Sequence, residues 1–141
     1  MKSQIAIVCR CILAFMLVWA MTDSAEAGPL GFKVTKAETG GISAGKQTII
    51  IHYTVKNTSH VEFFNRLNNI TVEITGDIGN GRRETYQKKV DVNYFFEPVL
   101  GPGSSKKLKT QFARKINPGK GWHPYRHVRV RILKYNAPRA S

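Results

Sequence analysis

The stretch that decides the fold is Ile49-Ile50-Ile51-His52-Tyr53-Thr54-Val55. Its apolar side chains recur with period two, which places Ile49, Ile51, Tyr53 and Val55 on one face of an extended chain. That alternation predicts a β-strand that buries one face. The opposite face includes Ile50 and is also partly apolar, so we expect this strand to lie inside its sheet and not at an edge.

Segments on both sides of this stretch share its alternation, and almost none show the 3.6-residue period of a helix. The glycine-rich run 76–81 predicts a hairpin, and Glu97-Pro98 predicts a strand end because proline cannot donate to a ladder. The pattern predicts an all-β fold, an immunoglobulin-like antiparallel β-sandwich of about six to seven strands. The further strands are expected around 32–34, 70–74, 90–96, 108–112 and 128–132, with a possible seventh at 61–64.

Three segments carry a resemblance to a known family: 53–59 (Tyr-Thr-Val-Lys-Asn-Thr-Ser), 72–81, and 100–104 (Leu-Gly-Pro-Gly-Ser). In these strand and turn signatures the chain resembles small bacterial extracytoplasmic immunoglobulin-like domains of the FxLyD type, over most of residues 47–133. The family's aromatic-leucine-tyrosine-aspartate motif has no counterpart at 73–77. The resemblance implies a sandwich fold, a cell-envelope or secreted setting, and a binding or accessory role without a catalytic site.

The N-terminus has the three parts of a secretory signal in their usual order. Lys2 and Arg10 precede an apolar run from Cys11 to Met21, and Ala25-Glu26-Ala27 fits a cleavage site. The apolar run is shorter than the roughly 20 residues of a membrane-spanning helix. We therefore expect a cleavable, helical signal peptide at 1–27, one basic domain at 28–141, a periplasmic or secreted location, and no membrane span after cleavage.

Cleavage would change the chemistry of the chain. Both cysteines, Cys9 and Cys11, lie in the signal, so no disulfide could form within residues 28–141. The segment also holds two basic and two acidic residues, which leaves the whole net charge of +13 on the domain.

The basic residues occur in clusters, and their alternation places several on strand faces turned away from the core. If strands 106–112 and 128–132 pair as a hairpin, like charges oppose each other at a cost of about 0.2–1 kcal/mol per pair. A polyanion would relieve that repulsion and release counterions. The alternative is a solvated face that serves solubility. The predicted anion-binding residues are Lys107, Lys109, Arg129, Arg131, Lys88 and Lys89.

A second candidate surface is the aromatic loop at 117–125, which contains Trp122, His123 and Tyr125. Its rings could stack on a sugar or a base while neighbouring cations hold an anionic group. The alternative is that Trp122 folds back to cap the open end of the sandwich.

The domain has few features of an enzyme. It has no cysteine and no local motif of nucleophilic catalysis, and Pro124 interrupts the His123/His127 pair. We predict no catalytic site, metal or cofactor. The main hypothesis is an exported non-catalytic module that binds an anionic envelope polymer or surface, with nucleic acid as an unspecific ligand. The alternatives are a protein–protein assembly domain of the envelope that uses exposed strands and, third, a secreted enzyme.

Overall fold

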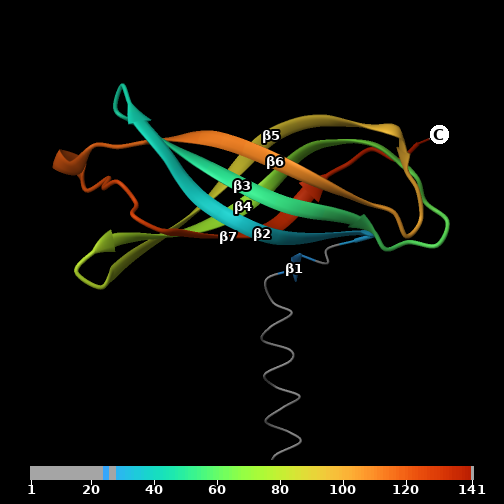
Figure 1. Ribbon diagram of the computed structural model, residues 1–141, viewed down its shortest axis with the longest axis horizontal. Coiled ribbons are helices and arrows are strands. Elements are labelled where there is room, and N and C mark those ends of the chain that lie inside the picture. The colour runs from blue at the N-terminus through green and yellow to red at the C-terminus, as the bar shows by residue number, and fades with distance from the viewer. Residues whose placement is uncertain (1–23, 26–27, 141) are drawn as a thin grey trace, which may run out of the picture.

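The computed structural model describes residues 24–25 and 28–140 (Figure 1), so the expected signal peptide lies almost entirely outside the described residues. Within them the chain is built from strands and one short 3-10 helix. No helix in the described ranges is long and apolar enough to cross a membrane. The elements are β1 (Ser24–Ala25), β2 (Leu30–Ser43), β3 (Lys46–Asn57), β4 (Phe64–Gly79), β5 (Arg82–Leu100), β6 (Ser105–Lys115), η1 (Pro118–Lys120) and β7 (Val128–Asn136).

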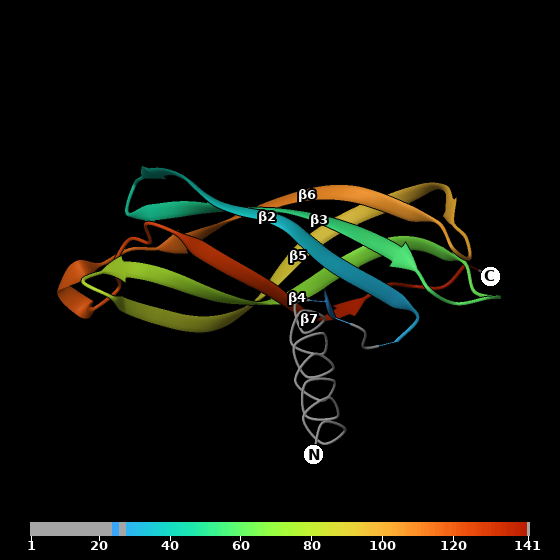
Figure 2. The ribbon, with the colours of Figure 1, turned by 60° about the horizontal axis from the view of Figure 1, so that its bottom comes forward.

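The strands form two antiparallel sheets, which Figure 2 shows stacked as two layers. Sheet A has the order β1-β2-β3-β6, and sheet B has the order β5-β4-β7. The chain crosses between the sheets after β3, β5 and β6, and the resulting β3–β6 and β4–β7 pairings match the B–E and C–F pairings of immunoglobulin-like sandwiches. The predicted all-β sandwich is confirmed, as is the interior position of the strand at 49–55.

The predicted hairpin at 76–81 is also confirmed, because β4 and β5 pair across a turn at Asn80 and Gly81. Both residues have positive φ, 55° and 71°, as two-residue hairpin turns of this kind require.

Three expectations about strands are corrected. Residues 61–63 form no strand, and Phe64 is already the first residue of β4. β5 does not end at Pro98: its pairing with β4 jumps from Phe95 to Leu100, so the proline sits in an unpaired bulge where no donor is needed. Strands β6 and β7 belong to different sheets, so the condition for a like-charge ladder, a hairpin between these two strands, is not met.

The core lies between the sheets and follows the alternation. On β3 the side chains of Ile49, Ile51, Tyr53 and Val55 are at most 1% exposed. Each such side chain contributes about 1.5–3 kcal/mol relative to its exposed state. The Tyr53 hydroxyl shares a hydrogen bond of 2.7 Å with the Thr110 hydroxyl, and burial raises the pKa of Tyr53.

Cations from β5 and β6 cover aromatic rings along the side of the sandwich where these two strands approach. Lys88 of β5 lies 5.6 Å from the ring centroid of Phe112 on β6, and Lys106 of β6 lies 6.0 Å from that of Tyr94 on β5. No strand pairing joins β5 to β6 in the described chain. Part of the positive charge therefore closes this side of the fold through cation–π contacts.

Candidate functional site

The six predicted anion-binding residues do not form one site. Lys107 and Lys109 lie on the outer face of sheet A, whereas Lys89, Arg129 and Arg131 belong to sheet B. Lys88 is half-buried between the sheets, where its Nζ donates to the carbonyl of Ala113 at 3.3 Å. The sequence pattern identified outward-facing positions but could not assign strands to sheets.

The structure adds three lysines to the sheet A residues. Two rows of side chains run across β2, β3 and β6. In one row Lys33 and Lys107 flank Thr54, and in the next row Lys36 and Lys109 flank His52. Lys56 follows these rows on β3, between Gly31 and Ser105. We call the exposed lysines of this surface the lysine face: Lys33, Lys36, Lys56, Lys107 and Lys109.

The lysine face spans three neighbouring strands. Lysines of β2 and β6 stand on either side of β3, whose outward side chains here are His52 and Thr54. Next to the β6 lysines is an open pocket of about 360 Å³, lined by Thr35, His52, Tyr53, Thr54, Lys107, Leu108 and Lys109.

Glu38 is the one acidic side chain on this face among the residues the structure describes. Its Oε1 is 3.1 Å from His52 Nε2 and its Oε2 is 3.3 Å from Lys36 Nζ. The hydrogen bonds from His52 and then Lys36 lower the pKa of Glu38. The carboxylate is thus already partnered, and the other four lysines of the face have no acid beside them among the described residues.

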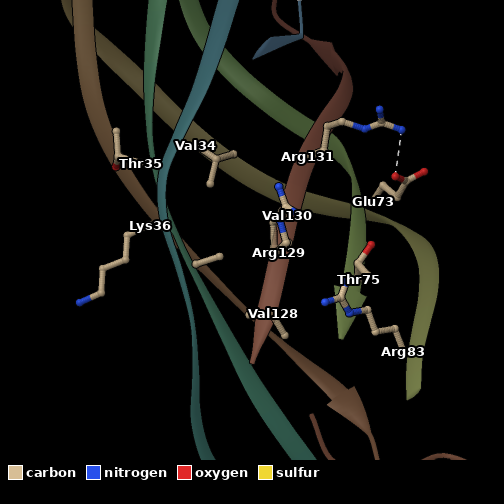
Figure 3. Close-up of a pocket in the computed structure, with 11 residues that line it drawn as sticks. Val34, Thr35, Lys36, Glu73, Thr75, Arg83, Val128, Arg129, Val130 and Arg131 are labelled. Carbon is tan, nitrogen blue, oxygen red and sulfur yellow. Dashed lines mark hydrogen bonds and ion pairs between the residues drawn. The ribbon is translucent and has the colours of Figure 1, made fainter. Parts of the chain in front are cut away.

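A groove separates β2 from β7 on the neighbouring side of the molecule (Figure 3). Its volume is about 360 Å³, and its lining combines apolar side chains with Arg83, Arg129 and Arg131. Arg131 is paired with Glu73 at 2.9 Å. Figure 3 shows Val34 pointing from β2 toward β7, whereas Lys36 points away from β7. We call this the β2–β7 groove, and Lys36 joins it to the lysine face.

The aromatic loop forms part of a third surface, a pocket at the end of the sandwich. It is open, has a volume of about 650 Å³, and combines aromatic, basic and acidic side chains. We call it the aromatic pocket; its lining is Glu84, Thr85, Tyr86, Arg114, Lys115, Lys120, Gly121, Trp122 and Tyr125.

Tyr125 is the fixed wall of the aromatic pocket and is only 4% exposed. The side-chain amide of Gln47 donates to its carbonyl at 2.7 Å and accepts from its N–H at 2.8 Å. Its ring lies so close to Gly76 that a Cβ there would collide with three ring atoms. Burial raises the pKa of Tyr125, against the opposing effect of Arg114.

Arg114 ties this wall to β6. Its guanidinium is 9% exposed, stacks on the Tyr125 ring, and lies 3.5 Å from Glu84 Oε2. Its Nη1 donates to the carbonyl of His123 at 2.6 Å, so His123 contributes its backbone to the pocket's support. Sequence reasoning missed Arg114, Glu84 and Tyr86, which only the folded chain brings beside the loop.

Trp122 does not cap the sandwich, contrary to one of the two expectations for it. The buried ring at this end belongs to Tyr125, and Trp122 remains 47% exposed at the rim of the pocket. His123 and His127 form no metal-binding cluster: among the described residues no three histidine, cysteine or acidic side chains gather closely enough to hold an ion.

No protein-family model, curated protein or solved structure matches this chain. The resemblance to FxLyD-type domains and the expected export therefore stay predictions.

Proposed function

We propose that the chain is an exported, non-catalytic module that binds an anionic envelope polymer or surface on its lysine face. The observation that carries the proposal is the gathering of five lysines on one sheet surface that has a single, already partnered acid. The signal-like N-terminus supports the extracytoplasmic setting, where anionic polymers are abundant.

The geometry suits a linear polyanion. Lys107 and Lys109 stand about 6.8 Å apart along β6, and β2 and β6 are about 10 Å apart with β3 between them. A chain laid along β3 would pass between lysines on both sides. Each neutralised charge would release a bound counterion, so the affinity should fall steeply with salt.

The competing explanation is that these lysines only keep the sheet soluble and protect its flanks from pairing with other chains. That role requires net charge but no particular arrangement. A variant with the same change of net charge on another face therefore distinguishes the two explanations.

The test is retention on immobilised polyphosphate at low ionic strength. The charge-reversal variant Lys107→Glu/Lys109→Glu should elute at a clearly lower salt concentration than the unaltered protein. The matched control, Lys89→Glu/Lys134→Glu, changes the net charge equally but on strands of sheet B. Equal losses in both variants would mean that only net charge matters, and the proposal would fail.

One observation favours the assembly alternative. β4 is the one described strand that pairs with β7, so the other edge of β7 is free beside the β2–β7 groove. Apolar side chains of the groove, including Val34 and Val130, could cover alternate residues of an added strand, and its arginines favour an acidic one. A peptide of alternating valine and glutamate should then raise the thermal midpoint of the protein, and a proline-interrupted version should not. No shift with either peptide would remove this alternative.

A further inference from the structure

We propose that the aromatic pocket is a sugar-binding site that takes one uronic acid ring, with the ring face on Trp122 and the carboxylate toward Lys115 and Lys120. The inference rests on the proposed function in one respect, since it identifies the anionic polymer as an acidic polysaccharide. It begins from the position of Trp122, a large exposed aromatic side chain in a pocket whose exposed lining is mostly apolar but includes charged side chains.

The backbone holds Trp122 in place. The N–H of Asn117 donates to the Trp122 carbonyl at 2.8 Å, and the N–H of Trp122 donates back to the Asn117 carbonyl at 3.0 Å. Between them η1 makes a tight turn that closes with Gly121 at φ 82°, a conformation that favours glycine. The loop is therefore built around this position, and ordering it on binding should cost little.

The part of the pocket that Tyr125 lines is equally fixed. Tyr125 is held by its two hydrogen bonds to Gln47 and by the stacked Arg114, as described above. The Trp122 backbone and the Tyr125 ring are thus both in place before a ligand arrives, as in most small-molecule sites.

Polar groups of the pocket have hydrogen-bonding capacity to spare. The Glu84 side chain is 34% exposed, and its two partners, Arg114 Nη2 and the Tyr125 hydroxyl, are both at the long distance of 3.5 Å. The Tyr86 hydroxyl is buried and has no hydrogen-bond partner among the described residues. Burial raises the pKa of this hydroxyl to about 12, and because its oxygen is closed to solvent we assign it no contact with the sugar.

A sugar uses this set of groups better than a nucleobase does. Its C–H face packs on indole, and its ring hydroxyls can donate to the Glu84 carboxylate. A nucleobase lacks both the C–H face and the ring hydroxyls. The carboxylate of a uronic acid supplies the anion for Lys115 and Lys120, which also line the pocket.

The pocket and the lysine face are joined by β6, which runs toward the loop that carries η1 (Figure 1). Lys107, Lys109 and Lys115 occupy alternate positions on the same side of this strand, over a span of about 27 Å. One polysaccharide chain could therefore lie on the lysine face and place a ring in the pocket.

The direct test uses the full chain with Trp19→Phe, which leaves Trp122 as the one tryptophan. Titration with tetragalacturonate should change the Trp122 emission saturably. Maltotetraose, which lacks the carboxylate, should bind at least about tenfold more weakly, as expected when charge-assisted hydrogen bonds are lost.

Variants then locate the contact by calorimetry. Trp122→Ala should weaken tetragalacturonate binding about tenfold or more, the usual effect of removing a stacking ring, and Trp122→Phe should retain part of the affinity. Phe95→Ala removes another exposed ring, on β5 and outside the pocket, and should leave the affinity unchanged. A denaturation curve checks that each variant is folded.

Two results would overturn the inference: no emission change with tetragalacturonate, or equal affinity in the folded Trp122→Ala and unaltered proteins. Polyphosphate separates this failure from failure of the proposed function, because it has no sugar ring to stack. If polyphosphate binding still depends on Lys107 and Lys109, the function stands and only the sugar site is wrong. If tetragalacturonate binding depends on Trp122 but polyphosphate binding does not depend on Lys107 and Lys109, the sugar site stands and binding by the lysine face is wrong.

Discussion

The guanidinium of Arg114 lies 3.6 Å from the centroid of the Tyr125 ring, and the same group donates to the backbone two residues earlier, at His123. One cation on β6 thereby fixes the loop that leads into β7. Its charge serves the structure, with Glu84 beside it, and contributes little to any surface field. Buried cations such as Arg114 therefore stabilise the fold, and only the exposed cations can bind an anionic ligand.

Arg114→Lys should destabilise the protein by about 1–3 kcal/mol, because an ammonium group cannot stack on the ring and keep the planar hydrogen-bond geometry. Chemical denaturation measures the change. Lys115→Ala, at the exposed neighbouring position, should stay within about 0.5 kcal/mol of the unaltered protein. Similar values for the two variants would refute the role given to Arg114.

Gly76→Ala should be among the more damaging small substitutions, since the new methyl group would collide with the Tyr125 ring. We expect a loss of at least about 1–3 kcal/mol, typical of overpacking. Adding Tyr125→Ala should make Gly76→Ala nearly neutral, a coupling that a double-mutant cycle measures. At Gly41 a Cβ meets nothing within 4 Å, so Gly41→Ala serves as the tolerated control.

Tyr86→Phe should raise stability and leave sugar binding unchanged. Removing a buried hydroxyl that lacks a protein partner should stabilise the fold by about 1 kcal/mol, and the sugar loses no contact. A loss of stability would contradict the first part of this prediction, and a weaker sugar affinity would contradict the second.

Tyr86→Phe should also change how stability depends on pH in the alkaline range. Burial raises the pKa of Tyr86 from 10.0 to about 12, so the folded state favours the neutral hydroxyl. The resulting stability is fully present below pH 10 and is lost as the pH rises through about 12. Denaturation midpoints across that window should therefore fall more steeply for the unaltered protein than for Tyr86→Phe.

Glu38→Gln removes the acid of the lysine face and should raise polyphosphate affinity about two- to fivefold at low salt, less at high salt. Glu97→Gln makes the same charge change at an exposed position on β5 and is the matched control. Affinities that rise equally in both would argue against a local effect of the lysine face.

Glu38 should also make the stability of the protein fall at acid pH. Its pKa is lowered from 4.5 chiefly by the hydrogen bond from His52, so its contribution is present above pH 4.5 and is lost as the pH falls through the lowered value. Glu38→Gln should lack this part of the acid dependence. Thermal midpoints measured across the acid range test it.

The strands could be predicted from sequence because each buries one face, and burial imposes the alternation read at 49–55. The hairpin at Asn80-Gly81 followed from turn residues that tolerate positive φ. Which strands share a sheet depends on long crossing connections that leave no local trace. For that reason the pairing of the strands that carry Lys107 and Arg129 could be stated only as a condition, and the two strands belong to different sheets.

The candidate sites show the same division. Alternation alone turns Lys107 and Lys109 outward, but placing Lys33 and Lys36 beside them requires the β2–β3 register and the bulge between Val34 and Lys36. The aromatic loop was recognisable by composition. Tyr125 and not Trp122 became its buried ring because Gly76, Gln47 and Arg114, from three other strands, enclose that position.

The most direct measurement of the central claim is the salt dependence of polyphosphate affinity in solution, plotted as log affinity against log salt. If the lysine face holds the polymer, the slope should be about −3 to −5, and Lys107→Gln/Lys109→Gln should reduce its magnitude by about 1.5–2. Lys89→Gln/Lys134→Gln should leave the slope nearly unchanged. A slope near zero, or the same reduction in both variants, would contradict binding by the lysine face.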